Sequence, residues 1–243
     1  MARVILGMSR VYLDEHPDKL CLSILYRENG DLYLSNKIDT PNGNASQIIE
    51  KKVRSEDVFL NASDHMFRVF SGNPDTVFIK TTSLFEYKPG SKLIKSILLT
   101  EIETVEFLAQ FCHKGLPEYL GCFVEDGYIK GICFRKYAIT LEKALMNNHL
   151  ILDKASFLAN IRDTVSFIHS KNLVHNDINP SNIMFDIIGN KLSSPILVDY
   201  DSCGKIGNLI GVKYGAPGWE RPSLISDPEN DFYSLEILED YIK

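Results

Sequence analysis

The sequence lacks the features that mark secreted, membrane-spanning and nucleic-acid-binding proteins. Its five cysteines are odd in number and form no C-x-x-C pair, so neither a disulfide framework nor a zinc site is expected. It has no apolar run of about 18 residues, the length that a membrane-spanning helix needs. The net charge is −6, and no stripe of lysine and arginine offers a basic surface to nucleic acid. We therefore expect a protein of the cytoplasm, with the nucleus as the alternative, that engages neither membrane nor nucleic acid.

The first 55 residues combine apolar runs with a polar stretch. Residues 1–36 contain apolar runs that predict strands, and Asn29-Gly30 between two of these runs predicts a hairpin turn. Residues 36–55 are polar, include T-P-N-G-N, and predict a loop or linker. No function is assigned to this part of the chain.

Residues 56–134 predict several strands and one helix. Three short apolar runs within residues 56–80, separated by N-A-S-D-H and S-G-N-P-D, predict a three-stranded antiparallel meander. A helix is expected next, because four apolar residues recur at helical spacing: Leu98, Ile102, Val105 and Leu108. Two further strands are predicted at 119–124 and 128–134.

The second half of the chain predicts mainly helices with polar loops between them. Thr140 is the expected cap of a short helix, and Asp153 is the expected cap of a longer helix that ends near Lys171. The remaining elements follow in order: short strands at 182–185 and 196–198, and a final helix at 231–242. Strands first and helices later indicate an α+β architecture.

A polar motif stands in this half between apolar flanks. The stretch H-N-D-I-N-P-S-N places Asp177 and Asn182 five residues apart, and V-D-Y-D adds Asp199 after a short gap. Phosphoryl transfer needs these groups: one carboxylate accepts the proton of the attacking hydroxyl, and an amide and a second carboxylate hold Mg²⁺. The alternative is an ordinary polar loop between two strands, but such a loop does not need this order of groups.

Together these segments resemble a eukaryotic protein kinase-like domain over residues 57–243, and most closely the short, divergent protein-kinase-like proteins of filamentous fungi. The resemblance implies a two-lobed α+β fold. Its small β-rich lobe is expected at 56–136 and its large, mainly helical lobe at 137–243, with a β-rich extension at 1–55. The large lobe is expected to be truncated, because a standard kinase has several more helices.

The resemblance also implies roles for single residues. Lys80, at the end of T-V-F-I-K, corresponds to the lysine that contacts the α- and β-phosphates of ATP. Glu101 corresponds to the glutamate that holds this lysine, with Glu103 as the alternative. Asp177 is the expected base, and the remaining implied sites are Asn182 and Asp199 for Mg²⁺ and 134–137 for the adenine ring.

Several positions depart from the family pattern. No glycine-rich phosphate loop is present near N-A-S-D-H, which weakens the expected grip on ATP. Asn179 stands where many serine/threonine kinases carry a lysine that reaches the γ-phosphate. Asp201 stands where glycine is usual, and we expect it to cap a turn, with a second metal ligand as the alternative.

Other positions bear on regulation and structure. Asn176 replaces the arginine that docks a phosphorylated activation loop, and the following segment has few acceptors, chiefly Ser202 and Tyr214, so activation by phosphorylation is not expected. The resemblance gives His175 a structural role and lets Asp231 bond the backbone of the catalytic loop. For Trp219, core anchoring and substrate docking stay open.

Three functions are therefore considered. The first is an ATP- and Mg²⁺-dependent phosphotransferase that acts on a serine or threonine hydroxyl and uses Lys80, Glu101, Asp177, Asn182 and Asp199. The second is a pseudokinase that serves as a binding or scaffold module. The third is a small-molecule kinase of the aminoglycoside or choline type. The implied partners are ATP and a protein or small-molecule substrate.

Overall fold

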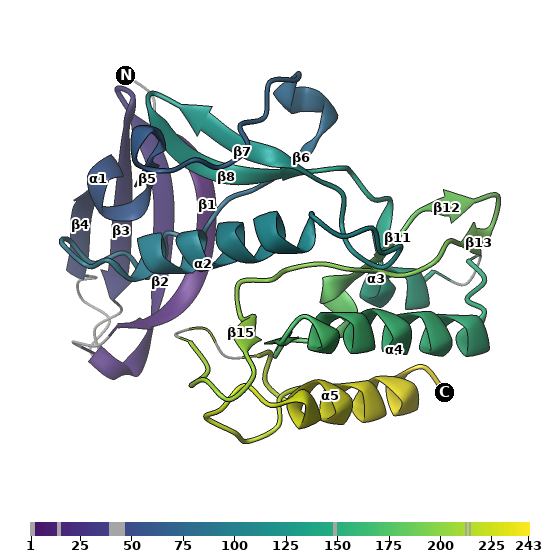
Figure 1. Ribbon diagram of the computed structural model, residues 1–243. Coiled ribbons are helices and arrows are strands. Elements are labelled where there is room, and N and C mark those ends of the chain that lie inside the picture. Colours follow the sequence, from purple (N-terminus) through teal and green to yellow (C-terminus); the bar gives the residue numbers. More distant parts are fainter. Residues whose placement is uncertain (1–2, 14–15, 39–46, 148–149, 212, 214) are drawn as a thin grey trace. The chain divides into compact units, whose positions relative to one another are not determined.

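The structure is a computed structural model that describes residues 3–13, 16–38, 47–147, 150–211, 213 and 215–243 (Figure 1). The chain forms two compact units. The first unit comprises Met1–Met66, Thr81–Leu98 and Val124–Lys130, and the second comprises Phe67–Lys80, Leu99–Phe123 and Gly131–Lys243. The expected α+β class is confirmed, because strands dominate the N-terminal part and helices the C-terminal part. The lobe limits given above stay a prediction.

The first unit contains a four-stranded antiparallel sheet whose strands are neighbours in chain order. Its strands are β1 (Val4–Leu13), β2 (His16–Glu28), β3 (Asp31–Ile38) and β4 (Gln47–Val53). The predicted hairpin turn is confirmed: Asn29 and Gly30 both have positive φ, 54° and 88°, and they join β2 to β3.

Strand β4 corrects the expected loop over residues 36–55. Its sequence carries little apolar alternation, yet it pairs with β3 over its whole length, from Leu32↔Val53 to Ile38↔Gln47. Cross-strand pairing, which a local pattern cannot show, therefore defines this strand. The T-P-N-G-N segment lies outside the described residues.

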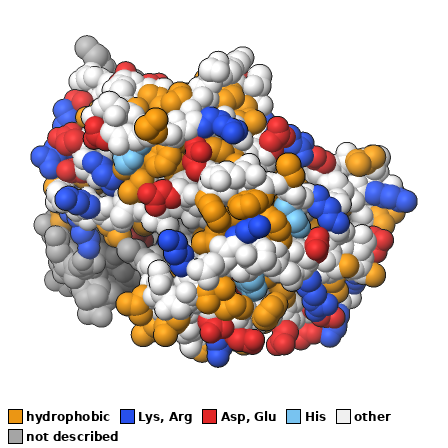
Figure 2. Space-filling view, in the orientation of Figure 1, with side chains coloured by type: hydrophobic (Ala, Val, Ile, Leu, Met, Phe, Trp, Pro, Cys, Tyr) orange, Lys and Arg blue, Asp and Glu red, His pale blue; other side chains and the backbone are white. Residues whose placement is uncertain are grey.

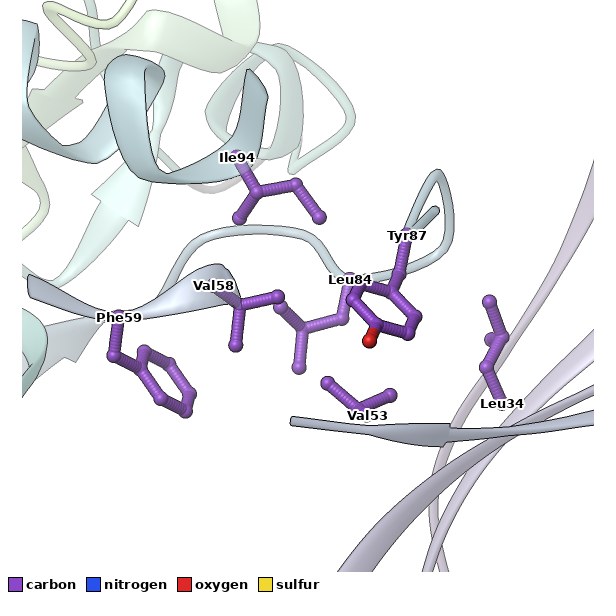
Figure 3. Close-up of a cluster of buried hydrophobic side chains, with 7 residues drawn as sticks. All are labelled: Leu34, Val53, Val58, Phe59, Leu84, Tyr87 and Ile94. Atoms are coloured by element: carbon purple, nitrogen blue, oxygen red, sulfur yellow. The ribbon is translucent and has the colours of Figure 1, made fainter. Parts of the chain in front are cut away.

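Figure 3 shows the buried apolar cluster of the first unit. Its seven side chains come from β3, β4, helix α1 (Ser55–Val58) and the residue that follows it, the loop after residue 81 and the start of helix α2: Leu34, Val53, Val58, Phe59, Leu84, Tyr87 and Ile94. Polar contacts close its edge, where Asp57 accepts hydrogen bonds from the Tyr87 hydroxyl at 2.8 Å and the Gly90 N–H at 3.1 Å. Burial of these side chains stabilises the N-terminal sheet together with residues beyond position 55.

The predicted meander over residues 56–80 is wrong. The two strands in this stretch, β5 (Leu60–Asn61) and β6 (Phe78–Lys80), pair with β8 (Tyr128–Phe134) and not with each other. Between them, the side chains of Asn61 and Asn73 accept hydrogen bonds from N–H groups two residues on and begin short 3₁₀ turns. Such side-chain bonds compete with strand pairing and interrupt the apolar runs.

Helix α2 (Leu93–Leu108) and the strand β7 (Tyr119–Glu125) confirm the predictions for this region, as does β8. The predicted apolar stripe of α2 is buried, with each of its four members at most 3% exposed. β7 and β8 are joined by Asp126-Gly127, both at positive φ, and pair with each other.

The described residues of the second unit form three further α-helices, each capped by a side chain. They are α3 (Leu141–Leu145), α4 (Lys154–Ser170) and α5 (Pro228–Tyr241), and α4 and α5 lie side by side (Figure 1). The predicted caps Thr140 and Asp153 are confirmed by hydrogen bonds from Lys143 N and Ser156 N. Helix α5 begins three residues earlier than predicted, because Asp227 caps it and a proline fills its first turn.

Short strands connect these helices. β9 (Ile139–Thr140), β11 (Ile183–Phe185) and β14 (Ile196–Leu197) form one small sheet, with β11 in the centre. The other pairs are β10 (Leu173–Val174) with β15 (Gly204–Lys205), and β12 (Ile187–Ile188) with β13 (Lys191–Leu192). The two strands predicted at 182–185 and 196–198 are thus confirmed, and their pairing brings the polar loops around them together.

On the face shown in Figure 2, acidic and basic side chains are interspersed. Among the described residues, no helix has the length and apolar character needed to cross a bilayer.

Candidate active site

All residues of the candidate site belong to the second unit, and Lys80 is at its centre. Lys80 ends β6 and pairs with Ile132 of β8, where Gly131 allows close approach: a Cβ atom there would lie 2.6 Å from the Lys80 carbonyl oxygen. The ammonium nitrogen lies near three carboxylate oxygens: Glu101 Oε1 at 2.5 Å, Asp199 Oδ1 at 2.6 Å and Asp201 Oδ2 at 3.4 Å. Burial lowers the pKa of Lys80, but these carboxylates outweigh it and raise that pKa, so the amine stays charged.

The structure places Glu101, and not the alternative Glu103, beside Lys80. Glu101 projects from the buried face of α2 and is 4% exposed, whereas Glu103 is exposed. The Oε1 atom of Glu101 also accepts a hydrogen bond from the Tyr200 N–H at 3.3 Å. Burial raises the pKa of Glu101 to about 6, although Lys80 opposes the shift.

Asp199 follows β14 in a left-handed backbone conformation, with φ of 71°. Left-handed residues other than glycine are uncommon, aspartate and asparagine adopt this conformation most readily, and it often occurs at functional sites. Burial raises the pKa of Asp199, but the ammonium groups of Lys80 and Lys213 outweigh this and lower its pKa below the usual range. The carboxylate is therefore a stable anion.

Asp177 lies in the loop between β10 and β11, and its carboxylate accepts hydrogen bonds from neutral donors among the described residues. Oδ1 accepts hydrogen bonds from Asn179 Nδ2 at 2.9 Å and from the Ala216 N–H at 2.8 Å. Oδ2 accepts one from Asn182 Nδ2 at 2.8 Å. Burial raises the pKa of Asp177, and the opposing effect of these hydrogen bonds is smaller.

A buried carboxylate, Asp231 of α5, fixes the backbone of this loop. Asp231 is fully buried and accepts hydrogen bonds from the His175 N–H at 2.9 Å, the Asn176 N–H at 2.8 Å and His169 Nε2 at 2.8 Å. His175 Nε2 in turn donates to the Val198 carbonyl at 3.2 Å, and its Nδ1 accepts from the Asp177 N–H at 3.3 Å. This histidine therefore joins the loop of Asp177 to the segment of Asp199.

Asn176 is buried where the family pattern has an arginine, and it uses its amide to join three segments. Its Nδ2 atom donates to the Ser202 carbonyl at 3.1 Å and to Ser226 Oγ at 3.0 Å. Its Oδ1 atom accepts from Asn230 Nδ2 at 3.0 Å. A neutral amide thus stands in the place of the charge that would bind a phosphate, and the expectation of no phosphorylation switch stays a prediction. Of the acceptors named for that switch, Tyr214 lies outside the described residues.

Asp201 is engaged in ion pairs rather than in the expected turn cap. Among the described residues its Oδ2 atom contacts the ammonium groups of Lys80 and Lys213. Lys213 could not be singled out from the sequence, since it belongs to no motif. The available signal was charge compensation: a buried carboxylate in the place of glycine needs a nearby cation.

A cavity of about 340 Å³ adjoins these residues, a size typical of small-molecule sites. Lys80, Asn182 and Asp199 form its polar end. The other lining residues include apolar side chains and the four predicted adenine-binding positions: Phe78, Phe134, Arg135, Lys136, Tyr137, Met184 and Val198. The cavity thus offers an apolar region for a flat ring next to a region for charged groups.

The polar end offers oxygen ligands to a magnesium ion. Both amide hydrogens of Asn182 are used, by the Asp177 carbonyl at 2.9 Å and by Asp177 Oδ2 at 2.8 Å, so Asn182 Oδ1 is left as an acceptor. The described residues hold no cluster of three His, Cys, Asp or Glu suited to a metal. Mg²⁺ commonly uses one or two carboxylates together with substrate phosphates, and Asn182 with Asp199 fits that pattern.

Two other expectations concern Trp219 and the N-A-S-D-H segment. Trp219 is half-buried, packs edge-to-face on Tyr241 at 5.3 Å between ring centroids, and accepts a hydrogen bond on its carbonyl from Ser234 Oγ at 2.7 Å. These contacts anchor Trp219 to α5, and substrate docking stays a prediction. Residues 61–64, near the expected phosphate loop, form an asparagine-capped 3₁₀ turn.

Comparison with known proteins gives relatives of one kind. No protein-family profile matches the chain. The probable serine/threonine-protein kinase fhkA of Dictyostelium discoideum is 27% identical over 252 residues, which cover 91% of this chain and 42% of that protein. The serine/threonine-protein kinase STE20 of Eremothecium gossypii is 33% identical over 212 residues, with 81% and 20% covered. STE20 of Candida glabrata is 27% identical over 179 residues, with 68% and 18% covered. The chain thus spans less than half the length of these relatives.

Proposed function

Because the chain contains a protein kinase-like domain, similar to serine/threonine kinases of fungi and Dictyostelium, we propose that it transfers the γ-phosphate of ATP to a serine or threonine hydroxyl. One observation carries the proposal. The Lys80 ammonium group is held between Glu101 and Asp199, and Asp177 and Asn182 are hydrogen-bonded to each other in the adjoining loop. A site that only bound a nucleotide has no need of a separate buried carboxylate poised to accept a proton.

In this proposal Lys80 contacts the phosphates and Glu101 positions it. The pair lies at 2.5 Å, and Glu101 is almost fully buried, so the lysine has a fixed direction. Fixing a charged donor before the reaction removes the cost of orienting it in the transition state. Asn182 Oδ1 and the Asp199 carboxylate would hold Mg²⁺, which neutralises charge on the phosphates when bound.

Asp177 is the proposed base, and its hydrogen bonds indicate which atom acts. Oδ1 already accepts two hydrogen bonds, whereas Oδ2 accepts only the one from Asn182 within the part of the chain that the structure describes. A carboxylate oxygen has two lone pairs, so Oδ2 keeps one for the hydroxyl of the acceptor. The raised pKa of Asp177 increases its affinity for the proton that this hydroxyl gives up.

A binding module is the second candidate, and one observation favours it. The Ala216 N–H donates to Asp177 Oδ1, so the segment that would receive a substrate already contacts the proposed base. The missing glycine-rich loop points the same way, because fewer backbone donors then surround the phosphates. In a binding module the nucleotide would bind and no phosphate would be transferred.

Two measurements on one preparation separate these functions. Thermal unfolding with Mg²⁺ and ATP is expected to give a higher midpoint than without them, because a ligand that binds the native state stabilises it. Incubation with Mg²⁺ and γ-labelled ATP, with casein and histone as acceptors, is expected to label serine or threonine. Asp199→Asn should remove both effects, and Asp240→Asn, at an exposed carboxylate, should keep both. A shift without label would favour the binding module, and neither effect at millimolar ATP would contradict both functions.

A further inference from the structure

Two ammonium groups converge on a single oxygen atom in this site. Oδ2 of Asp201 lies 3.4 Å from the Lys80 nitrogen and also contacts the Lys213 nitrogen. The Asp201 side chain is only 8% exposed, whereas that of Lys213 is 42% exposed. An anionic oxygen shared by two cations has the same surroundings as a phosphate oxygen in a protein site.

The segment that carries Lys213 is anchored a short distance further along the chain. The Ala216 N–H donates to Asp177 Oδ1 at 2.8 Å. At Gly215 the backbone passes so close that a Cβ atom would lie 2.6 Å from the Asn176 carbonyl oxygen. The backbone two and three residues after Lys213 is therefore held against the loop of the proposed base. Its charge reaches Asp199 as well, since it helps to lower the pKa of that carboxyl.

The balance of charges around the site leaves the Lys213 ammonium group available to bind an anionic ligand. Among the described residues, the cluster around Lys80 brings three carboxylates, Glu101, Asp199 and Asp201, together with two lysines, Lys80 and Lys213. Lys80 is divided among all three carboxylates. Lys213 contacts only Asp201 in the ion pairs of the described residues, so it is the more available donor. A nucleoside triphosphate adds further negative charge, which needs compensation in a partly buried site.

Asn179 cannot supply this compensation. Its amide is neutral, and Nδ2 donates to the Asp177 carboxylate while Oδ1 accepts from the Ser181 N–H at 3.0 Å. The position that carries a phosphate-binding lysine in many kinases is thus used here to orient the proposed base. A second cation has to come from another segment.

We propose that Lys213 is the second phosphate-binding cation of this site, held in place by Asp201 until the terminal phosphate of a nucleoside triphosphate accepts its ammonium group. The proposal rests on the nucleotide site of the proposed function. It assigns Lys213 a contact with substrate and Asp201 a positioning role. The alternative is that Lys213 only neutralises Asp201. In that case, replacing both residues should restore the nucleotide affinity that Lys213→Met alone removes.

The test compares binding of two magnesium nucleotides by isothermal titration calorimetry. The probes are ADP and the non-hydrolysable triphosphate analogue adenylyl imidodiphosphate. Lys213→Met is expected to weaken binding of the triphosphate analogue about tenfold or more, the value of a lost charged hydrogen bond, and to change ADP binding less than about twofold. Lys213→Arg should keep most of the triphosphate affinity. Lys205→Met, an exposed lysine of the same segment, is the matched control and should bind both nucleotides as the wild type does.

The double variant decides between contact and neutralisation. If Lys213 touches the terminal phosphate, Asp201→Asn combined with Lys213→Met stays as weak for the triphosphate analogue as Lys213→Met alone. Recovery of affinity in the double variant, or equal losses for the two nucleotides in Lys213→Met, overturns the proposal. So does a Lys213→Met protein with unchanged binding.

The result also separates this proposal from the proposed function. A wild type that binds neither nucleotide contradicts both. A wild type that binds both nucleotides, loses triphosphate preference in Lys213→Met and transfers no phosphate supports the role of Lys213 while it contradicts catalysis. Lys213 is partly exposed, and its substitution removes no buried apolar group, so the variant should fold. The thermal unfolding midpoint of the Lys213→Met protein without nucleotide checks this.

Discussion

The pKa values of two aspartates in the same site are shifted in opposite directions: that of Asp177 is raised and that of Asp199 is lowered. Burial raises the pKa of both Asp177 and Asp199 and is the largest single influence on each. Around Asp199 two ammonium groups outweigh it and lower the pKa, whereas around Asp177 the Ala216 N–H, the electrostatic effect of His175 and the Asn179 amide do not, and the pKa stays raised. The comparison teaches that the charge of the partners, rather than the residue type or its burial, separates a carboxylate that accepts a proton from one that holds a cation.

The largest effect is expected when the proposed proton acceptor, Asp177, is removed. Asp177→Asn keeps the shape and the neutral surroundings but cannot accept a proton. Phosphate transfer is expected to fall on the order of 10³-fold, the usual contribution of a general base. Binding of Mg²⁺ and ATP should change little, because Asp177 is not among the proposed ligands. Steady-state kinetics and calorimetry check this, and a parallel loss of binding and turnover would contradict the division of roles.

A smaller effect is expected when the loop that carries Asp177 is released. Asp231→Ala removes a fully buried acceptor of three hydrogen bonds. We expect the free energy of unfolding to fall by about 3 kcal/mol, because the donors of His175 and Asn176 lose their partner in the interior. Asp227→Ala, which removes only the cap of α5, should cost about 1 kcal/mol. Urea denaturation measures both, and equal costs would show that Asp231 does not hold the loop.

The stability of the protein is also expected to depend on pH through Glu101. The folded pKa of Glu101, about 6, lies above its usual value of 4.5, so the folded state binds this proton more tightly than the unfolded state. The stability that follows is present below pH 4.5 and is lost as pH rises through 6, a change of about 2 kcal/mol. Asp199 contributes in the opposite sense. Because its folded pKa is lowered, it stabilises the folded state at pH values above its usual pKa, and this stability is lost as pH falls through the folded pKa.

Glu101→Gln isolates that effect. Unfolding free energies of wild type and variant should diverge between pH 4.5 and 6, with the wild type losing stability relative to the variant as pH rises. Glu103→Gln, on the exposed face of the same helix, is the control and should follow the wild type. A difference between wild type and Glu101→Gln that stays constant over this range would contradict the raised pKa.

Much of the fold could be predicted where short-range chemistry decides it. The Asn29-Gly30 turn, the caps Thr140 and Asp153, and the stripe of α2 each follow from residues within about one turn of each other. The strand β6 follows from its apolar run, but the strand β4 and the pairing of β5 and β6 with β8 could not be predicted, because they depend on partners far along the chain. The apolar runs at 56–80 were visible, but their partner strand was not.

The site divides in the same manner. Lys80, Glu101, Asp177, Asn182 and Asp199 stand in motifs with known spacing, and the structure brings them together in one unit, while their roles stay predictions. The Ala216 N–H and Lys213 have no such signal. A backbone donor is invisible in a sequence, and the contact of Lys213 with Asp201 depends on how the intervening segment returns to the site.

The central claim, that partner charge divides the roles of Asp177 and Asp199, is tested most directly by titrating their carboxyl carbons with ¹³C NMR on selectively labelled protein. Difference spectra against Asp177→Asn and Asp199→Asn assign the two signals. As pH falls from neutral, the Asp177 signal is expected to titrate first while the Asp199 signal keeps its anionic shift. Titration of Asp199 before Asp177, or of both together, would contradict the account.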